Sequence, residues 1–219
     1  MITVLMAAKT STEYMPHAIG SLLGQSYTDW HLVIGINGLP DSHPAHKEAS
    51  EHTRAFYSRV TILNLPNCQN KGRALNEMVK HAQGNYVAIL DVDDLWHPLK
   101  LERQIPFVEM GYDVVGTAGS YFGQHQNSIG VVHGEISRTN FQYGNCIINS
   151  SAVIRREHAR WEPMNEPLED YELWLRLVAE ERKIFNVGQH LTFVRQHDTN
   201  WSKQGKWDDA IKALRQRYG

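Results

Sequence analysis

The chain has 219 residues, of which 42% are hydrophobic and 21% are charged, and its formal net charge is −2. This length suffices for one large α/β domain, and the small net charge argues against a protein that wraps nucleic acid, because binding many phosphates requires a large excess of Lys and Arg. We expect a cytoplasmic protein, since the apolar stretches are too short to span a bilayer and the N-terminus lacks the charged region and long apolar core of a signal peptide.

The first half of the chain alternates short apolar runs with amphipathic patterns, which is typical of parallel βαβ units. The apolar runs predict strands at residues 2–6, 30–36, 60–65 and 86–90. Between them, apolar residues at helical spacing, preceded by capping residues or prolines, predict helices. These helices are expected over residues 12–23, 44–57, 71–79 and 98–110.

The alternation loosens after residue 111. Further strands are predicted at 112–117, 129–133, 184–187 and 191–195, and helices at 169–182 and 207–217. Residues 147–154 are apolar and β-branched, so they are expected to form either a strand or a buried helical turn. Because no internal repeat or low-complexity linker divides the chain, we expect a single domain, with residues 1–110 as a nucleotide-binding front half and residues 111–219 as a mixed back half.

Polar or glycine-containing loops follow each of the first four predicted strands. They are residues 6–9, 37–38, 67–72 and 91–94. The carboxyl ends of parallel strands share one edge of an open sheet, and ligands bind along that edge. The four loops together therefore predict a ligand site there, although each loop taken alone is typical of an ordinary turn.

The most informative of these loops is Asp91-Val92-Asp93-Asp94, which directly follows a buried strand. Three carboxylates within four positions repel one another and are costly to desolvate unless a cation lies beside them. A divalent metal that also holds a phosphate meets this requirement, because hard cations prefer oxygen ligands and keep open positions for substrate phosphates.

Three other interpretations of this acidic run stay open, but each fits less well. A calcium-binding loop would need a glycine where Trp96 stands, and Leu95 offers no ligand. A phosphatase nucleophile at Asp91 is disfavoured because Leu95 occupies the fifth position of that motif and a long βαβ region precedes it. A solvated helix cap would need only Asp94 and would leave Asp91 and Asp93 without a role.

Five parts of the chain follow known sequence signatures. They are SLLGQSYTDW at 21–30 with the run 32–41 after it, the asparagine–glycine loop at 70–76, the DxD triplet at 91–93, EDYELWLRL at 169–177 and Arg-x-His at 195–197. In this combination the chain resembles the family-two glycosyltransferases over nearly its whole length. The resemblance implies the GT-A fold, an α/β fold whose mostly parallel, Rossmann-like central sheet is flanked by helices, and a transferase that uses a nucleotide-sugar.

The resemblance also implies a divalent cation, Mn²⁺ or Mg²⁺, at the acidic run. Asp93 corresponds to the carboxylate that binds the cation bridging the donor's diphosphate, and Asp91 to the residue that holds the ribose or a metal-bound water. A histidine at the place of His197 completes metal or diphosphate binding in several relatives.

Further residues that contact the nucleotide-sugar are expected around this run. They are Ala8, Asn37, Asn70, Lys71, Arg73, Val92 and Trp96. Asn37 departs from the family, in which an acidic residue faces uracil and ribose, and an amide offers a donor as well as an acceptor there. Lys71 and Arg73 are expected to contact phosphate or base, unless they are solvent-exposed cations at a helix start. Trp96 is expected to wall the sugar pocket.

Asp170 corresponds to the family's catalytic base, and Glu169 is expected to assist by orienting the acceptor or the base. An inverting transfer needs one carboxylate to take the proton of the acceptor hydroxyl, while a metal rather than an acid stabilises the departing diphosphate. The simpler alternative for Asp170 is a carboxylate at a helix N-terminus, favoured by the helix dipole. We therefore predict metal-dependent, inverting transfer from a nucleotide-diphosphate donor, expected to be a UDP-sugar, to a hydroxyl of a glycan or glycoconjugate. The donor is expected to bind residues 1–110, and residues 111–219 are expected to form the acceptor-binding and catalytic half of the domain.

Two other functions stay open. A sugar-phosphate nucleotidyltransferase shares a similar front half but would need a glycine-rich, basic loop after the first strand, and residues 6–14 contain no glycine. A catalytically inactive nucleotide- or carbohydrate-binding module is disfavoured by the intact Asp91, Asp93 and Asp170. The length also allows the chain to be one domain of a larger polypeptide, since many relatives carry further membrane or acceptor modules.

Overall fold

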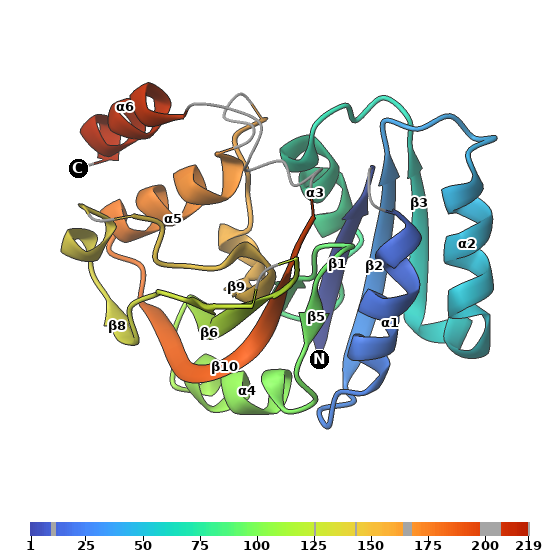
Figure 1. The fold of residues 1–219 in the computed structure, drawn as a ribbon, viewed down its shortest axis with the longest axis horizontal. Coiled ribbons are helices and arrows are strands. Elements are labelled where there is room, and N and C mark those ends of the chain that lie inside the picture. The colour runs from blue at the N-terminus through green and yellow to red at the C-terminus, as the bar shows by residue number, and fades with distance from the viewer. Residues whose placement is uncertain (10–11, 125, 143, 164–167, 198–206, 219) are drawn as a thin grey trace.

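The computed structural model describes residues 1–9, 12–124, 126–142, 144–163, 168–197 and 207–218 (Figure 1). Within these residues a ten-stranded sheet runs in the order β3-β2-β1-β4-β9-β6-β10-β5, with β7 added to β6 and β8 to β10. The strands are β1 (Ile2–Ala8), β2 (Trp30–Asn37), β3 (Val60–Leu65), β4 (Tyr86–Ile89), β5 (Leu95–Trp96), β6 (Val114–Gly123), β7 (Ser128–Ile129), β8 (Gly134–Ile136), β9 (Val153–Arg155) and β10 (Ile184–Gln196).

Helices cover the sheet, and short 3-10 helices connect several of its elements. The α-helices are α1 (Met15–Leu23), α2 (Pro44–Thr53), α3 (Lys71–Val79), α4 (Lys100–Glu109), α5 (Glu169–Ala179) and α6 (Asp208–Tyr218). The 3-10 helices are η1 (Thr12–Tyr14), η2 (Arg54–Arg59), η3 (Arg138–Gln142), η4 (Asn149–Ser151) and η5 (Arg156–His158). Among the described residues, no helix combines the length and hydrophobicity that a membrane crossing requires.

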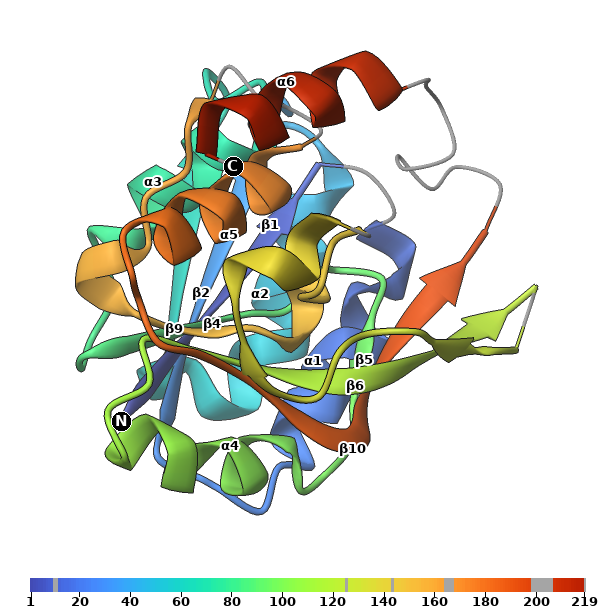
Figure 2. The same cartoon turned by 90° about the vertical axis from the view of Figure 1, so that its left-hand side faces the viewer.

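Strands β3, β2, β1 and β4 form a parallel unit, as the alternating pattern predicted. Because helices pack on both faces, these strands are rich in apolar residues, and all eight residues of β2 are buried. Successive residues of β1 therefore serve different cores. Val4 and Met6 belong to the cluster that contains residues of α1, α2 and α4, whereas Leu5 belongs to the cluster that contains residues of α3, α5 and α6. Figure 2 shows α1 and α4 on one side of the sheet and α3, α5 and α6 on the other.

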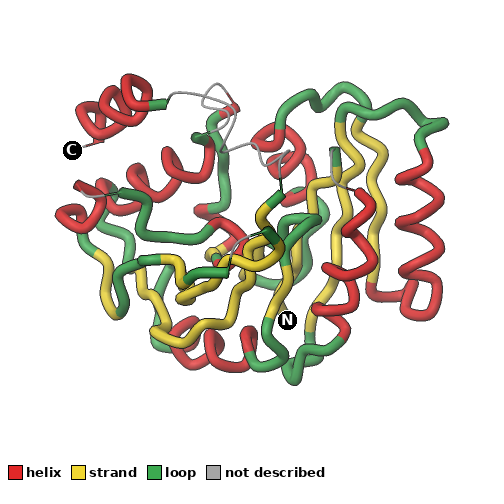
Figure 3. Tube along the Cα trace, in the orientation of Figure 1, coloured by secondary structure: helices red, strands yellow, loops and turns green. Residues whose placement is uncertain are grey.

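The back half of the chain extends this sheet with mixed pairing. Strand β9 is antiparallel to both β4 and β6, and the long strand β10 runs parallel to β6 and antiparallel to β5. Figure 3 shows the strands in the middle of the molecule with helices around them. The pairing of β10 with β5 brings the end of β10 beside the loop that follows β4. The fold is thus one α/β domain with a mostly parallel central sheet, as expected.

Three elements of the back half differ from the prediction. The strands expected at 184–187 and 191–195 form the single strand β10, whose register against β6 shifts between Val187 and Thr192. Residues 147–154 contain both predicted alternatives, since the 3-10 turn η4 is followed by β9. Of the strand expected at 129–133, only Ile129 lies in a strand, β7, and residues 130–133 connect β7 to β8. This run is not part of the core, since Val132 is 38% exposed.

Candidate active site

The acidic run forms a turn at the carboxyl end of β4. The Asp94 N–H donates to the Asp91 carbonyl at 3.1 Å, which closes the turn before β5 begins. Strand β5 then pairs with Thr192 and Phe193 of β10. This pairing places the end of β10, with His197 just beyond it, against the acidic turn. The site therefore joins the two halves of the chain.

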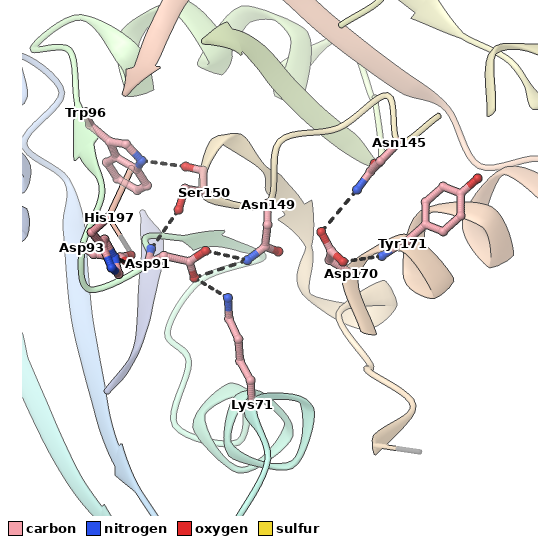
Figure 4. A network of polar contacts seen from close by, with 10 residues as sticks. All are labelled: Lys71, Asp91, Asp93, Trp96, Asn145, Asn149, Ser150, Asp170, Tyr171 and His197. Carbon is pink, nitrogen blue, oxygen red and sulfur yellow. Dashed lines mark hydrogen bonds and ion pairs between the residues drawn. The ribbon is translucent and has the colours of Figure 1, made fainter. Parts of the chain in front are cut away.

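Asp91 and Asp93 have separate partners (Figure 4). The Lys71 ammonium lies 2.5 Å from Asp91 Oδ1, and the Asn149 amide donates to both Asp91 oxygens at 3.1 and 3.3 Å. Asp93 Oδ2 lies 2.9 Å from His197 Nε2. The cation expected beside Asp91 is thus supplied in this structure by a lysine of the chain itself.

Asp94 is a buried carboxylate rather than a solvated helix cap. It is 4% exposed, and its Oδ1 accepts from the Arg195 N–H at 2.9 Å. Burial, followed by the charges of Asp93 and Asp91, raises the pKa of Asp94 well above its ordinary value, whereas a hydrogen bond with Ser150 lowers it. Helix α4 begins only at Lys100 without a side-chain cap. The helix-cap interpretation of this residue is therefore wrong.

The start of α3 explains how Lys71 reaches the acidic turn. Asn70 caps the helix, because its Oδ1 accepts from the Arg73 N–H at 2.9 Å, while its Nδ2 donates to the Pro163 carbonyl at 2.8 Å. The second bond ties the front half to the back half just before the candidate base. Burial opposes the charge on Lys71, but Asp91 and then Glu169 raise the pKa of its ammonium group above the ordinary value.

Asp170 lies in the first turn of α5, on the back-half side of the site. Its Oδ1 accepts from the Tyr171 N–H at 2.7 Å, and its Oδ2 accepts from Asn145 Nδ2 at 3.3 Å. Burial raises the pKa of Asp170 above its ordinary value, and the Lys71 ammonium opposes this rise. The Lys71 ammonium therefore interacts electrostatically with both Asp91 and Asp170.

Several predicted contact residues lie beneath the site rather than on its surface. Ala8, Asn37, Val92 and Trp96 are between 0% and 7% exposed. Asn37 Nδ2 donates to the Cys68 carbonyl at 3.2 Å, and Trp96 Nε1 donates to the Ser150 carbonyl at 2.7 Å. The buried ring of Trp96 is thus bonded to η4 beside the acidic turn. Its role as a wall of the sugar pocket stays a prediction.

The remaining predicted residues divide by exposure. Glu169 is 5% exposed beside Asp170, whereas Arg73 is exposed on α3. Asn149 and Ser150 are contacts that sequence reasoning missed. They lie in η4, 58 and 59 residues from their partner Asp91. No motif marks them, and in the sequence they are only polar residues within the run 147–154 that is expected to be a strand or a buried turn.

The donor groups at the acidic turn fit a divalent cation only in part. Within the described residues, no three His, Cys, Asp or Glu side chains are grouped to hold a metal. Asp93 and His197 nevertheless offer one oxygen and one nitrogen side by side. Because Mg²⁺-type sites use one or two carboxylates together with substrate phosphates, this pair suits a cation that arrives with a diphosphate. Both Asp91 oxygens already accept hydrogen bonds from the chain.

The family model and the two related sequences compared with this chain are all described as glycosyltransferases. The family model described as Glycosyl transferase family 2 matches residues 3–165. The putative glycosyltransferase EpsE of Bacillus subtilis is 27% identical, over 89% of this chain and 73% of its own length. The O-antigen biosynthesis glycosyltransferase WbnJ of Escherichia coli is 29% identical, over 93% of this chain and 82% of its own length.

Solved structures share the fold. S. aureus TarS 1-349 in complex with UDP-GlcNAc matches with a TM-score of 0.76 at 15% identity, over 99% of this chain and 66% of that chain. The mannosyltransferase PcManGT from Pyrobaculum calidifontis, in complex with GDP-Man and Mn²⁺, matches with a TM-score of 0.71 at 13% identity, over 92% of this chain and 59% of that chain. This chain thus spans less than two thirds of the length of these solved chains.

Proposed function

The chain belongs to glycosyltransferase family 2 and has the GT-A fold, and from this premise we propose that it transfers a sugar from a UDP-sugar to a hydroxyl of a glycan or glycoconjugate with inversion at the anomeric carbon. The observation that carries the proposal is the pair of carboxylate centres on either side of Lys71. One centre is the acidic turn with its basic partners, and the other is Asp170.

The proposed donor site belongs to residues 1–110, with His197 added from the end of β10. Asp93 and His197 would hold Mn²⁺ or Mg²⁺ together with phosphate oxygens of the donor, and the bound cation would stabilise the negative charge of the departing nucleoside diphosphate. Complexes of two proteins of this fold support the choice of ligand, since TarS 1-349 holds UDP-GlcNAc and PcManGT holds GDP-Man with Mn²⁺.

The proposed base belongs to residues 111–219. Asp170 would take the proton of the acceptor hydroxyl as that oxygen attacks the anomeric carbon and the bond to the nucleoside diphosphate breaks on the opposite face. Burial raises the pKa of Asp170, which strengthens it as a proton acceptor, while the Lys71 ammonium favours the ionised form that the reaction needs. A single carboxylate base suffices here, whereas a glycoside hydrolase needs two carboxylates.

This proposal can be tested with a panel of nucleotide-sugars, in the presence of Mn²⁺ and of EDTA, by measuring melting temperature and nucleotide release. We expect UDP with Mn²⁺ to raise the melting temperature by mass action and a UDP-sugar with acceptor to release UDP. Asp170→Asn should keep the UDP-induced shift and lose transfer, Asp93→Ala should lose both, and the exposed Asp209→Asn should lose neither. Full activity of Asp170→Asn would remove Asp170 as the base. Pyrophosphate release from UTP and a sugar phosphate would identify a nucleotidyltransferase instead.

A further inference from the structure

One short backbone segment contacts both carboxylate centres of the proposed site. Residues 145–151, here called the asparagine segment, lead from η3 towards β9. At its start, Asn145 Nδ2 donates to Asp170 Oδ2 at 3.3 Å. Four residues later, Asn149 Nδ2 donates to Asp91 Oδ2 at 3.1 Å and to Oδ1 at 3.3 Å (Figure 4). The segment therefore connects the proposed base with the donor-side carboxylate.

Both amide groups have a fixed orientation. Asn145 Oδ1 accepts from the Ile147 N–H at 3.0 Å, so the NH₂ group faces Asp170. Asn149 Oδ1 is buried and has no hydrogen-bond partner within the described part of the chain. A buried acceptor without a partner is unfavourable, yet turning the amide over would place that oxygen against the Asp91 carboxylate. In this orientation the Asp91 carboxylate receives hydrogen bonds from Asn149 Nδ2, while Asn149 Oδ1 is left without a partner among the described residues.

The asparagine segment is also anchored to the acidic turn itself. Ser150 Oγ accepts from the Asp91 N–H at 3.0 Å, and the Ser150 carbonyl accepts from Trp96 Nε1 at 2.7 Å. Backbone bonds close η4, with the Ser151 N–H donating to the Ile148 carbonyl at 2.8 Å. Packing holds the other end, because Ile147 is 1% exposed. The segment is therefore held to the acidic turn at one end and packed into the core at the other.

A nearby asparagine shows what a purely structural role looks like. Asn186 is 1% exposed, and its Nδ2 donates to the carbonyls of Val132 and Cys146 at 2.8 and 2.7 Å. Its side chain thus binds backbone only. Asn145 and Asn149 instead direct their donors at two carboxylates, which are the proposed base Asp170 and Asp91 in the acidic turn of the proposed donor site.

We propose that Asn145 and Asn149 are positioning residues, which hold Asp170 and Asp91 at a fixed separation from one backbone segment. The inference rests on the proposed function, since it assumes that these two carboxylates act on acceptor and donor. Neither asparagine is a catalytic residue, because each acts through the carboxylate that it contacts. Partners of this kind orient the groups that bind or react, and their loss typically reduces affinity or activity without abolishing it.

Single substitutions distinguish the role of Asn149 in UDP binding from the role of Asn145 in kcat. Asn149→Ala should weaken the binding of UDP with Mn²⁺ about ten- to hundredfold, and Asn145→Ala should leave that binding unchanged and lower kcat about ten- to hundredfold. Asn85→Ala, an exposed asparagine before β4, is the matched control and should change neither quantity. A general loss of packing would instead affect both measurements in both variants. UDP affinity unchanged in Asn149→Ala, or kcat unchanged in Asn145→Ala, would overturn the proposal.

Two further measurements keep the inference testable if an alanine variant folds poorly or the wild-type chain proves inactive. Asn145→Asp and Asn149→Asp keep the side-chain shape but replace the donor with a repelling carboxylate, so the same split in kcat and UDP affinity is expected. Crystal structures of the variants need no activity, and they should show Asp170 or Asp91 turned away from its present position. Unmoved carboxylates would overturn the inference, whereas absent transfer by an intact wild-type chain would overturn only the proposed function.

Discussion

The Lys71–Asp91 ion pair gives the most precise prediction about stability at the site. The two charges lie 2.5 Å apart, and the side chains are 28% and 23% exposed. A hydrogen bond between charged groups contributes about 1.5–3 kcal/mol net, and this partial burial places the pair within that range rather than near the low values of exposed pairs. We therefore expect a coupling free energy of about 2 kcal/mol.

A double-mutant cycle in urea at pH 7, with Lys71→Met, Asp91→Asn and the double variant, measures this coupling. Lys71→Met should lower the melting temperature by about 4–8 °C, since about 1 kcal/mol corresponds to about 2–4 °C in a chain of this size. The exposed Lys80–Glu77 pair, at 2.7 Å on α3, is the matched control and should show a coupling of about 0.2–0.5 kcal/mol. Equal couplings for the two pairs would refute the reasoning.

The pH dependence of this effect has a definite sign. Burial raises the pKa of the Asp91 carboxyl, but Lys71 and the hydrogen bonds to Asp91 hold this pKa below its ordinary value. A carboxyl with a lowered pKa in the folded chain stabilises it above the unfolded pKa of about 4 and loses that contribution as the pH falls through the folded value. The stability difference between wild type and Lys71→Met should therefore shrink below about pH 4. A difference independent of pH would contradict the assignment.

Three further predictions concern residues outside the site. Asp113→Asn should lower the free energy of unfolding by about 1.5–3 kcal/mol at pH 7, because Asp113 accepts a hydrogen bond from Arg155 Nε at 3.0 Å. Although burial raises the pKa of Asp113, the Lys183 N–H and Arg155 lower it below its ordinary value. Urea unfolding should therefore show this loss vanishing as acid protonates the wild-type carboxyl. Lys100→Met should gain stability relative to wild type as the pH falls from 9 to 6, since burial lowers the pKa of Lys100 well below its ordinary value and folding must then displace a proton; a constant difference would contradict this. Gly119→Ala should destabilise by about 1–3 kcal/mol in thermal unfolding, because its Cβ would lie 2.8 Å from the Thr192 carbonyl, and an unchanged melting temperature would show that β6 can shift.

The front half of the fold could be predicted because its signals are local. Strands covered by helices on both faces favour apolar runs, and the predicted strands at 30–36 and 60–65 differ from β2 and β3 by at most one residue. The back half depends on distant pairing. The sequence predicts two strands at 184–187 and 191–195, yet pairing with β6 holds residues 184–196 as one strand with shifts in register.

The candidate site shows the same division. Asp91, Asp93, Asn70 and Asp170 could be selected because motifs or strand ends mark them in the sequence. The residue that neutralises Asp91 could not be predicted, since charge repulsion among the three aspartates indicates only that some cation is needed. Lys71, which lies 20 residues away in the chain, supplies that positive charge. The same holds for Asn149, whose role depends on the packing of η4 against the acidic turn.

The most direct test of the account is a crystal structure of the chain with UDP and Mn²⁺. The central claim predicts the cation between Asp93 and His197, bound to oxygens of the diphosphate, with the nucleotide lying across the carboxyl ends of β1 and β2. An acidic turn that faces solvent, with no nucleotide or cation beside it at saturating ligand, would contradict the proposal.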